Sequence, residues 1–306
     1  MAVYVNTNVS SLNGRRYLNN VQNQLTTTYQ RLSSGMRINS AKDDAAGLQI
    51  ADRLTTQING LNQGNRNSND AIALAQTMEG ALDETTSMLQ KIRTLAVQAA
   101  NGTNTAEDRK AMQQEVTSLS EEVNRIADQT KFGGQQILAG ANKGILDAKA
   151  QITFQVGANK GDEITLTSMS KGFTISGIAT VAGALKIETD AAKAADTGLI
   201  KIGQTARWSI SSASAAKKTL ENIDKFIAAV DAKRADLGAF QNRLESSIRN
   251  QSNVSANQAD ARSRIRDADF AEESANLSQQ SIIQQAATSM LMQANSRPQL
   301  ALSMLG

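Results

Sequence analysis

The chain has 306 residues and a hydrophobic content of 40%, which allows about two domains with folded cores. It contains no Cys and no His, which excludes thiol nucleophiles, disulfides, Cys/His zinc sites and imidazole acid-base chemistry. Aromatic residues make up only 3%, a composition that favours long helices over a sandwich or barrel. The net charge of +3 is too balanced for a dedicated nucleic-acid binder, and no apolar run is long enough to span a membrane.

The two ends of the chain are poor in charge. Residues 1–42 contain five basic residues and no acidic one, and residues 274–306 contain only Arg297. The basic beginning resembles an amphipathic targeting segment, but no apolar stretch follows the first methionine. We therefore expect no cleaved secretory signal. The absence of Cys does not decide the compartment.

Regular apolar spacing predicts a very long first helix. From Leu74 to Ala99 apolar residues recur in steps of 4 and 3, and helical spacing continues backward to Ile50. We expect one helix from about Asp44 to Asn101, where an Asn-Gly pair ends it.

Two further stripes supply partners for this helix. A second helix is expected to begin after Thr103, with acidic residues in its first turn, and to pack antiparallel on the first. A third stripe runs from Ala216 to Ile248, with polar Arg234 and Gln241 at two seam positions that fix the register. The sequence predicts a mainly α fold, built on a long antiparallel coiled-coil-like helical rod.

Shorter apolar stripes mark both ends of the chain. They are too narrow to form stable helices alone, and we interpret them as surfaces that one monomer cannot bury. Paired terminal helices of many copies could bury them, as in a helical assembly. The residues of this expected assembly interface are Leu18, Val21, Leu25, Leu32, Ile283, Ala287, Met290 and Ala294.

The middle of the chain has a different pattern. Apolar residues alternate with a period of two in 152–156 and again in 164–166, and a turn-forming segment separates the two runs. A small β-hairpin is therefore expected in the middle of the chain. Residues 171–206 hold few large apolar side chains, so only a small β-rich excursion or exposed loops are expected there.

The candidate chemical motifs favour structural roles. Adjacent Asp43 and Asp44 would diverge by about 100° on a helix and could not flank one bond. We interpret Ser40 with Asp43 as a capping box at the start of the helix. The acidic run 267–273 has Glu272 where a calcium loop needs Gly, so capping by Asp269 and Glu272 is preferred. We expect no catalytic residue, no metal site and no cofactor.

Four stretches closely resemble bacterial flagellin: MAVYVNTNVSSLN at 1–13, RLSSGMRINSAKDDAAGLQIAD at 31–52, LGAFQNRLESSIRN at 237–250 and SRIRDADFAEE at 263–273. Further motifs extend the resemblance: TKFGGQQIL at 130, FQVGANKGDEI at 154 and SIIQQAATSMLMQANSRPQLALSML at 281. The resemblance covers about 1–170 and 207–306.

The resemblance implies a division of the chain into segments. Residues 1–43 and 257–306 would form the connectors and the inner, channel-lining helical domain. Residues 44–170, with the hairpin, and 207–256 would form the surrounding rod domain. Residues 171–206 would be a short variable, surface-exposed segment. Flagellins carry outer domains in that position, so these would be nearly absent here and the filament would be thin and smooth.

The function implied by the resemblance is a structural subunit that polymerises into the bacterial flagellar filament for swimming motility, without enzymatic activity. The implied partners are other copies of the chain, the flagellar type III export apparatus, an export chaperone on the C-terminal segment, and the filament cap and hook-junction proteins. Export through the flagellum's own channel agrees with an uncleaved, acid-free N-terminus. The protein would then be extracellular, with no nucleic-acid or membrane partner.

Flagellins that alert the host innate flagellin receptor do so through the rod helices. The matching positions here are Gln90, Lys91, Leu95, Gln98 and Glu115. Lys91 stands where the family has Arg, and Thr94 where Glu is usual. Lys replaces a bidentate Arg poorly. The alternative role of these residues is subunit packing.

Two alternative functions stay open. The flagellin-like junction protein between hook and filament shares both ends, although the RINSAKDDAAG and SRIRDADFAEE motifs agree more closely with the filament protein. A cytoplasmic coiled-coil adaptor would show the same periodicity. Electron microscopy of material sheared from cells would separate these functions, because only a filament protein appears there as long helical fibres.

Overall fold

The computed structural model describes residues 7–167, 170–183, 198–202 and 205–303. Contacts divide the chain into two compact units: a terminal unit of Met1–Ile58 with Val254–Gly306, and a central unit of Asn59–Asn253. Helices account for 72% of the described residues, and the strands found there form only small antiparallel pairs. The predicted mainly α fold class is confirmed.

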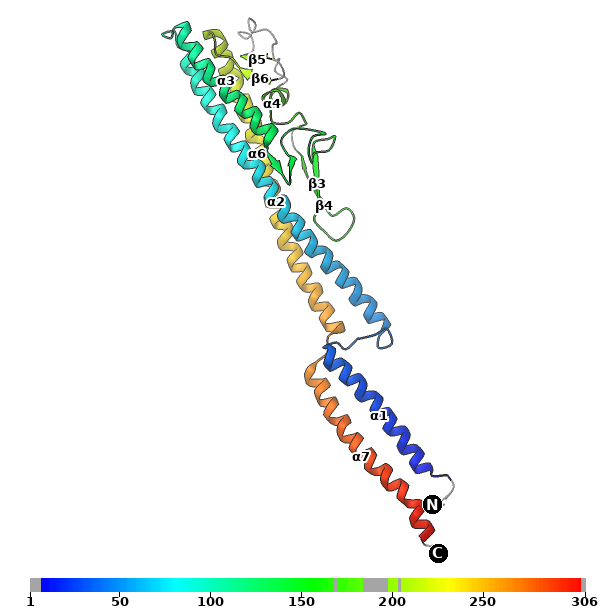
Figure 1. Ribbon diagram of the computed structural model, residues 1–306. Coiled ribbons are helices and arrows are strands. Elements are labelled where there is room, and N and C mark those ends of the chain that lie inside the picture. The colour runs from blue at the N-terminus through cyan, green and yellow to red at the C-terminus, as the bar shows by residue number, and fades with distance from the viewer. Residues whose placement is uncertain (1–6, 168–169, 184–197, 203–204, 304–306) are drawn as a thin grey trace. The chain divides into compact units, whose positions relative to one another are not determined.

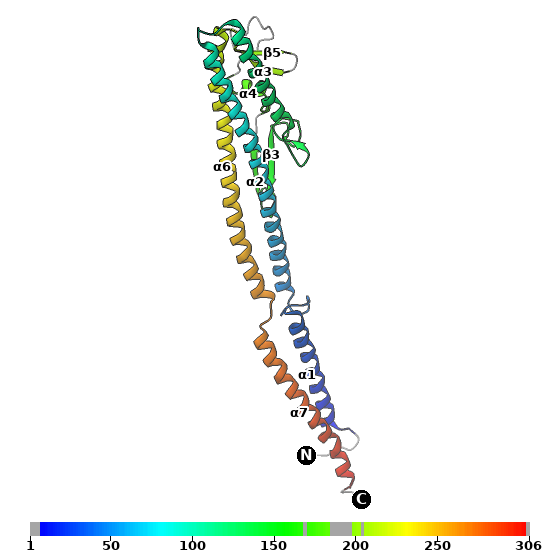
Figure 2. The same cartoon turned by 60° about the vertical axis from the view of Figure 1, so that its left-hand side comes forward.

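Three long helices contribute to the central unit: α2 (Ala45–Ala100), α3 (Ala106–Gln129) and α6 (Ala213–Arg266). Their upper parts run side by side in both views of the chain (Figures 1 and 2). The predicted seam lies in the core of the central unit. Five of its large side chains are at most 2% exposed, namely Leu74, Met78, Leu82, Leu89 and Ile92, and Met88 and Leu95 pack partly buried against them. The sequence-based bounds of α2 are confirmed to within one residue at each end.

The two polar seam positions of α6 pair with α2. Arg234 Nη2 lies 2.8 Å from Asp83 Oδ1, and Gln241 Nε2 donates to Glu79 Oε2 at 2.9 Å. Both interactions require one particular alignment of the two helices. They support the predicted role of these positions in fixing the register.

The start of α2 differs from the expectation. Asp44 is its N-cap, because Asp44 Oδ1 accepts a hydrogen bond from Gly47 N at 2.9 Å. Asp43 Oδ2 instead accepts from Ser40 N at 2.9 Å and from Asn39 N at 3.1 Å. The predicted Ser40 capping box is therefore wrong, since these bonds close a separate turn before the helix begins.

The start of α3 has a complete capping box. Thr105 Oγ1 accepts from Asp108 N at 3.2 Å, and Asp108 Oδ2 accepts from Thr105 N at 2.8 Å. Arg109, one residue further on, donates to Ala99 O at 2.9 Å and to Asn101 O at 3.0 Å. The last carbonyl groups of a helix have no hydrogen-bond partner within that helix, and Arg109 in the first turn of α3 supplies partners for those at the end of α2.

The strands β3 (Gln151–Gln155) and β4 (Glu163–Thr167) pair antiparallel, which confirms the predicted hairpin. The end of β3 lies directly on the backbone of α2. A Cβ added at Gly64 would lie 1.9 Å from Val156 O, so only glycine permits this approach. A smaller antiparallel pair, β1 (Lys131–Phe132) with β2 (Gln135–Gln136), follows α3.

The segment 171–206 requires a correction, because its described parts belong to the core. It contains α4 (Ile175–Val181), β5 (Leu199–Ile202) and the start of β6 (Thr205–Trp208), and β5 pairs antiparallel with β6. Four of its large apolar side chains are at most 1% exposed, namely Phe173, Ile175, Ile178 and Leu199, and Ile200 is 7% exposed, whereas Val181 is 47% exposed. The expectation of a surface-exposed segment is wrong for these parts, whereas the β5–β6 pair agrees with the alternative of a small β-rich excursion. Residues 184–197 lie outside the described residues.

Polar side chains of α3 hold this segment in place. Asn124 Nδ2 donates to Ala206 O, and Asn124 Oδ1 accepts from Ile175 N, both at 3.0 Å. Gln113 Nε2 donates to Trp208 O at 2.9 Å. The backbone of β6 is therefore bonded both to β5 and to side chains of α3. Fewer of its N–H and C=O groups are left without a hydrogen-bond partner.

The terminal unit contains the pair α1 (Val9–Ser34) and α7 (Phe270–Ser303). The two helices run antiparallel, because Asn8 at the start of α1 donates to Ala294 O and Arg31 near its end contacts Glu273. Asp269 Oδ1 accepts from Ala271 N at 2.8 Å, so the predicted capping of α7 by Asp269 is confirmed.

The chain enters and leaves this helix pair through two segments that bond to each other. Arg37 N donates to Arg266 O at 2.7 Å, and Ala268 N donates to Gly35 O at 3.0 Å. Gly35, with φ +70°, ends α1 in the left-handed region where glycine is favoured. The α1–α7 pair is thus bonded at its base as well as along its length.

Candidate assembly surface

The apolar stripe of α1 faces α7 of the same chain. Val21 and Leu25 are 7% and 6% exposed, and Leu18 and Leu32 are partly buried in line with them. A Cβ added at Gly14 would lie 3.1 Å from Leu291 Cδ1, so the two helices approach closely. The expectation that one monomer cannot bury this stripe is wrong, because α7 covers it.

On α7 the covered row differs from the expected stripe. Its members recur in steps of 4 and 3: Glu273, Leu277, Gln280, Gln284, Ala287, Leu291 and Ala294. Of the four residues expected there, Ala287 and Ala294 belong to this row. Ile283 and Met290 do not, and they are 41% and 71% exposed.

Polar contacts contribute to the pairing of α1 with α7. Arg31 Nη1 lies 3.1 Å from Glu273 Oε1, and Glu273 is 7% exposed. Thr28 Oγ1 donates to Gln280 Oε1 at 3.3 Å. Sequence reasoning missed this ion pair, although one signal was present, since Glu273 is the last acidic residue of the chain.

An exposed apolar flank runs beside the seam of the helix pair. Tyr17 of α1 is 70% exposed and Met290 of α7 is 71% exposed, and both line a shallow hollow together with Gly14 and Ala294. Ile283 lies seven residues, or two helical turns, before Met290 and therefore on the same side of α7. We call Tyr17, Ile283 and Met290 the apolar flank. Tyr17 was not predicted, because it is adjacent to the stripe rather than on it.

The side of α7 turned away from α1 is uncharged and mostly polar. At 100° per residue it carries exposed Ser278, Gln285, Ser289 and Ser296, together with two exposed apolar residues, Ile282 (67%) and Met292 (64%). No residue from 274 to 296 is charged. Helix α7 therefore presents a covered row, an apolar flank and an uncharged polar face.

The five positions matched to receptor contacts lie together on α2 and α3. Gln90, Lys91 and Gln98 are exposed on α2, and Glu115 is exposed on α3. Lys91 Nζ lies 3.0 Å from Glu115 Oε1. Leu95 is partly buried and packs against the core. The structure thus brings all five to one region of the central unit.

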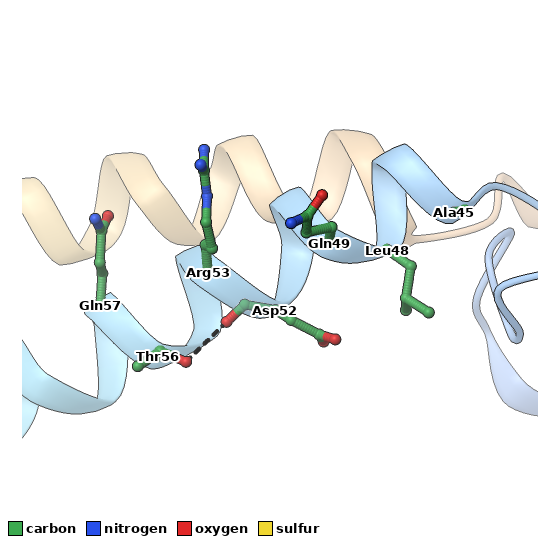
Figure 3. A pocket seen from close by; sticks show the side chains of 7 residues that line it. All are labelled: Ala45, Leu48, Gln49, Asp52, Arg53, Thr56 and Gln57. Atoms are coloured by element: carbon green, nitrogen blue, oxygen red, sulfur yellow. Dashed lines mark hydrogen bonds between the residues drawn. The ribbon is translucent and has the colours of Figure 1, made fainter.

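A second hollow, drawn in Figure 3, lies on the surface of α2 in the terminal unit. Figure 3 shows Gln49, Arg53 and Gln57 on one side of the helix, whereas Asp52 projects on another side. Thr56 Oγ1 donates to the backbone carbonyl of Asp52 at 3.0 Å, an ordinary helical bond. Because the polar groups do not converge, this hollow has no catalytic arrangement.

The perturbed carboxyl groups also have local structural causes. The pKa of Asp108 is lowered by hydrogen bonds from the Thr105 hydroxyl and backbone, and that of Asp43 by bonds from Ser40. The pKa of Glu122 is lowered by its bond with Arg125. All three are exposed or nearly so. Among the described residues no cluster of acidic side chains could hold a metal ion, and no helix is long and apolar enough to cross a membrane.

Two family models match the chain. One, the bacterial flagellin N-terminal helical region, matches residues 5–143, and the other, the bacterial flagellin C-terminal helical region, matches residues 220–305. The chain is 36% identical to flagellin D of Vibrio anguillarum and 37% identical to flagellin A of Vibrio cholerae serotype O1, and each alignment covers 100% of both proteins. These alignments run over 387 and 385 positions, more than the 306 residues here, so each relative has residues without a counterpart in this chain.

One solved structure supports the fold. It is described as a putative flagellar hook-associated protein from Vibrio parahaemolyticus, and it matches 74% of this chain and 100% of its own with a TM-score of 0.55. At 17% sequence identity the likeness shows a shared fold.

Proposed function

The chain belongs to the bacterial flagellin family, and from this membership we propose that the α1–α7 pair is the part through which its copies assemble. The chain is a structural subunit of the flagellar filament and serves motility. The family membership implies self-polymerisation and contact with hook-associated proteins. A filament subunit is favoured over a hook-junction protein because the full-length relatives at 36–37% identity are flagellins.

The observation that carries the proposal is the exposure of the apolar flank. Tyr17, Ile283 and Met290 are more than a third exposed in the single chain. Burying a side chain of this size gains about 1.5–3 kcal/mol. A neighbouring copy that covers the flank would make this gain once per subunit, and a helical array would repeat it along the filament.

The uncharged polar face of α7 suits the lining of the filament channel. Its hydroxyl and amide groups around Gln285 and Ser289 bind water and offer no fixed charge to a passing chain. Unfolded subunits on their way to the filament tip carry both signs of charge, and a charged wall would retain one of them. We propose that export occurs through this channel by the flagellar export apparatus, with a chaperone on the C-terminal segment before export and the filament cap at the tip.

Two further properties follow from this proposal. The subunit acts outside the cell, because the flagellar filament of the family is extracellular. It has no enzymatic activity, in agreement with the structural role of the family. The second property agrees with the absence of Cys and His from the sequence.

The region around Lys91 is the proposed contact for the host innate flagellin receptor. Gln90, Lys91, Gln98 and Glu115 are exposed there in the single chain. Lys91 presents one point charge already paired with Glu115, whereas an Arg would offer two parallel donors. Recognition through this region should therefore be weaker than in a flagellin with Arg at this position.

Seeded polymerisation of Met290→Asp tests the assembly role. Ser289→Asp is the matched control, because it adds the same charge one residue away, on the proposed channel face. Both side chains are exposed in the single chain, so the two variants should unfold at the same urea concentration as the unmodified chain. Met290→Asp should fail to elongate seeds, because an unpaired buried charge costs several kcal/mol in every subunit. Ser289→Asp should elongate them.

Two results would contradict the proposal. One is normal elongation by Met290→Asp, since the apolar flank would then not be covered in the filament. The other is a block by Ser289→Asp as complete as that by Met290→Asp, because the polar face would then be a packed interface and not a channel lining. Electron microscopy of the products distinguishes filaments from amorphous aggregates.

A further inference from the structure

Three Asn-Gly pairs occur in the chain, at 13–14, 59–60 and 101–102. In such a pair the backbone nitrogen of the glycine can attack Cγ, the amide carbon of the asparagine. The new bond from that nitrogen to Cγ closes a five-membered succinimide, the bond between Cγ and Nδ2 breaks, and ammonia leaves. Water then opens the ring to aspartate or isoaspartate. Glycine permits the attack because it has no Cβ to obstruct it.

Two of the three pairs lie inside helices. Gly14 is in α1 and Gly60 is in α2. Within an α-helix each backbone N–H donates to the carbonyl four residues earlier, so the attacking nitrogen is engaged and points along the helix axis. The reaction at Asn13 or Asn59 therefore requires local opening of the helix.

The third pair lies in the turn between α2 and α3. Asn101 is exposed, and the hydrogen bonds of this turn engage Asn101 and Thr103: Asn101 N donates to Gln98 O, and Thr103 N donates to Asn101 Oδ1 at 3.4 Å. Gly102 N is the donor in none of the bonds of the described residues. No atom lies within 4 Å of the position that a Cβ of Gly102 would occupy.

We propose that Asn101 is a site of spontaneous deamidation. It should react faster than Asn13 and Asn59, because its Asn-Gly pair lies in a turn and the other two lie inside helices. The reaction needs water alone and releases ammonia. It removes one unit from the net charge of +3 and, in the isoaspartate product, lengthens the main chain by one carbon atom. Deamidation would thus mark the age of a subunit that is not replaced.

The modification would change the contacts of the turn. Arg109 Nη2 donates to Asn101 O at 3.0 Å, and Arg109 Nε donates to Ala99 O at 2.9 Å. In isoaspartate the backbone carbonyl carbon of Asn101 becomes the free carboxylate and Cγ continues the main chain, so the Arg109 guanidinium faces a carboxylate in place of a carbonyl group. The connection that caps the end of α2 is therefore the part of the fold that the reaction alters.

Peptide mapping of the aged chain tests this proposal. The full folded chain is incubated in mildly alkaline buffer, digested with trypsin and analysed by mass spectrometry. Cleavage places the three pairs in separate peptides, 1–15, 54–66 and 94–109. Peptide 94–109 should gain about 1 Da and yield isoaspartate, whereas the other two should react at least about tenfold more slowly because their helices must open first. In urea all three should react at rates within about threefold of one another.

Gly102→Ala is the second test. Gly102 is not at positive φ and the Cβ has free space, so the variant should fold normally. The added methyl obstructs the attack, and deamidation at Asn101 should slow about tenfold. The proposal is overturned if folded Asn101 reacts no faster than Asn59, or if Gly102→Ala leaves the rate unchanged.

Discussion

Asn124→Ala tests whether α3 holds the described parts of 171–208 in the core. The amide of Asn124 is 6% exposed and bonds two backbone groups outside its own helix, Ile175 N and Ala206 O, each at 3.0 Å. The substitution leaves both without that partner. A buried polar group left unpaired costs about 1–3 kcal/mol. The loss in the free energy of unfolding should therefore be about 2–6 kcal/mol, reduced by roughly 0.5 kcal/mol because Ala favours the helix more than Asn does.

Trp208 provides the assay, since it is the only Trp of the chain and lies at the site. Its ring is fully buried and packs edge-on against Phe226 with 4.7 Å between ring centroids. Urea unfolding followed by Trp208 fluorescence therefore reports directly on this region. The expected result for Asn124→Ala is a lower midpoint with an unchanged slope.

Asn69→Ala is the matched control. Asn69 is exposed on α2, so the same substitution changes helix propensity without removing a buried bond. It should be neutral or stabilise by up to about 0.5 kcal/mol. If Asn124→Ala costs less than about 1 kcal/mol relative to this control, the polar side chains of α3 do not hold the segment and the reasoning is refuted.

Two further predictions concern the central unit. Gly64→Ala should displace the end of β3, lower the free energy of unfolding in urea by about 1–3 kcal/mol and speed amide exchange in 156–162. Gly80→Ala is the control, because its added Cβ meets no atom within 4 Å, and it should raise the free energy of unfolding by about 0.5–1 kcal/mol. Equal effects of the two substitutions would contradict the close approach at Gly64. The pKa of Asp108 is lowered in the folded chain by Thr105, so its contribution to stability is present above the ordinary value of 3.8 and is lost as pH falls below it. Melting temperatures measured across this range should fall more steeply for the unmodified chain than for Asp108→Asn.

The long helices could be predicted because their apolar seam is continuous. From Leu74 to Ile92 the apolar seam residues belong to the core cluster or pack against it, so local spacing and tertiary packing favour the same structure. The polar exceptions, Arg234 and Gln241, could also be interpreted from sequence. Their place on the seam implied partners on the facing helix, and they have them.

The segment after the hairpin could not be predicted, for a physical reason. Its apolar residues are few, and sparse composition suggested exposure. Its described parts are bonded to Asn124 and Gln113, which belong to a different element and which sequence spacing marks only as polar residues on α3. A contact between a helix side chain and a distant strand backbone leaves no periodic signal in either segment.

On α7 the prediction from apolar spacing selected residues that α1 does not cover. The row of α7 covered by α1 contains Glu273, Gln280 and Ala287, whereas the larger apolar Ile283 and Met290 remain exposed. A helix that completed its burial within one chain would place the large apolar residues inside. In α7 two leucines, Leu277 and Leu291, join small and polar residues in the pairing within the chain, whereas Ile283 and Met290 stay outside it. In the proposed assembly these two side chains gain their burial between copies and not within one chain, which is why a rule based on burial within the single chain does not find the row that α1 covers.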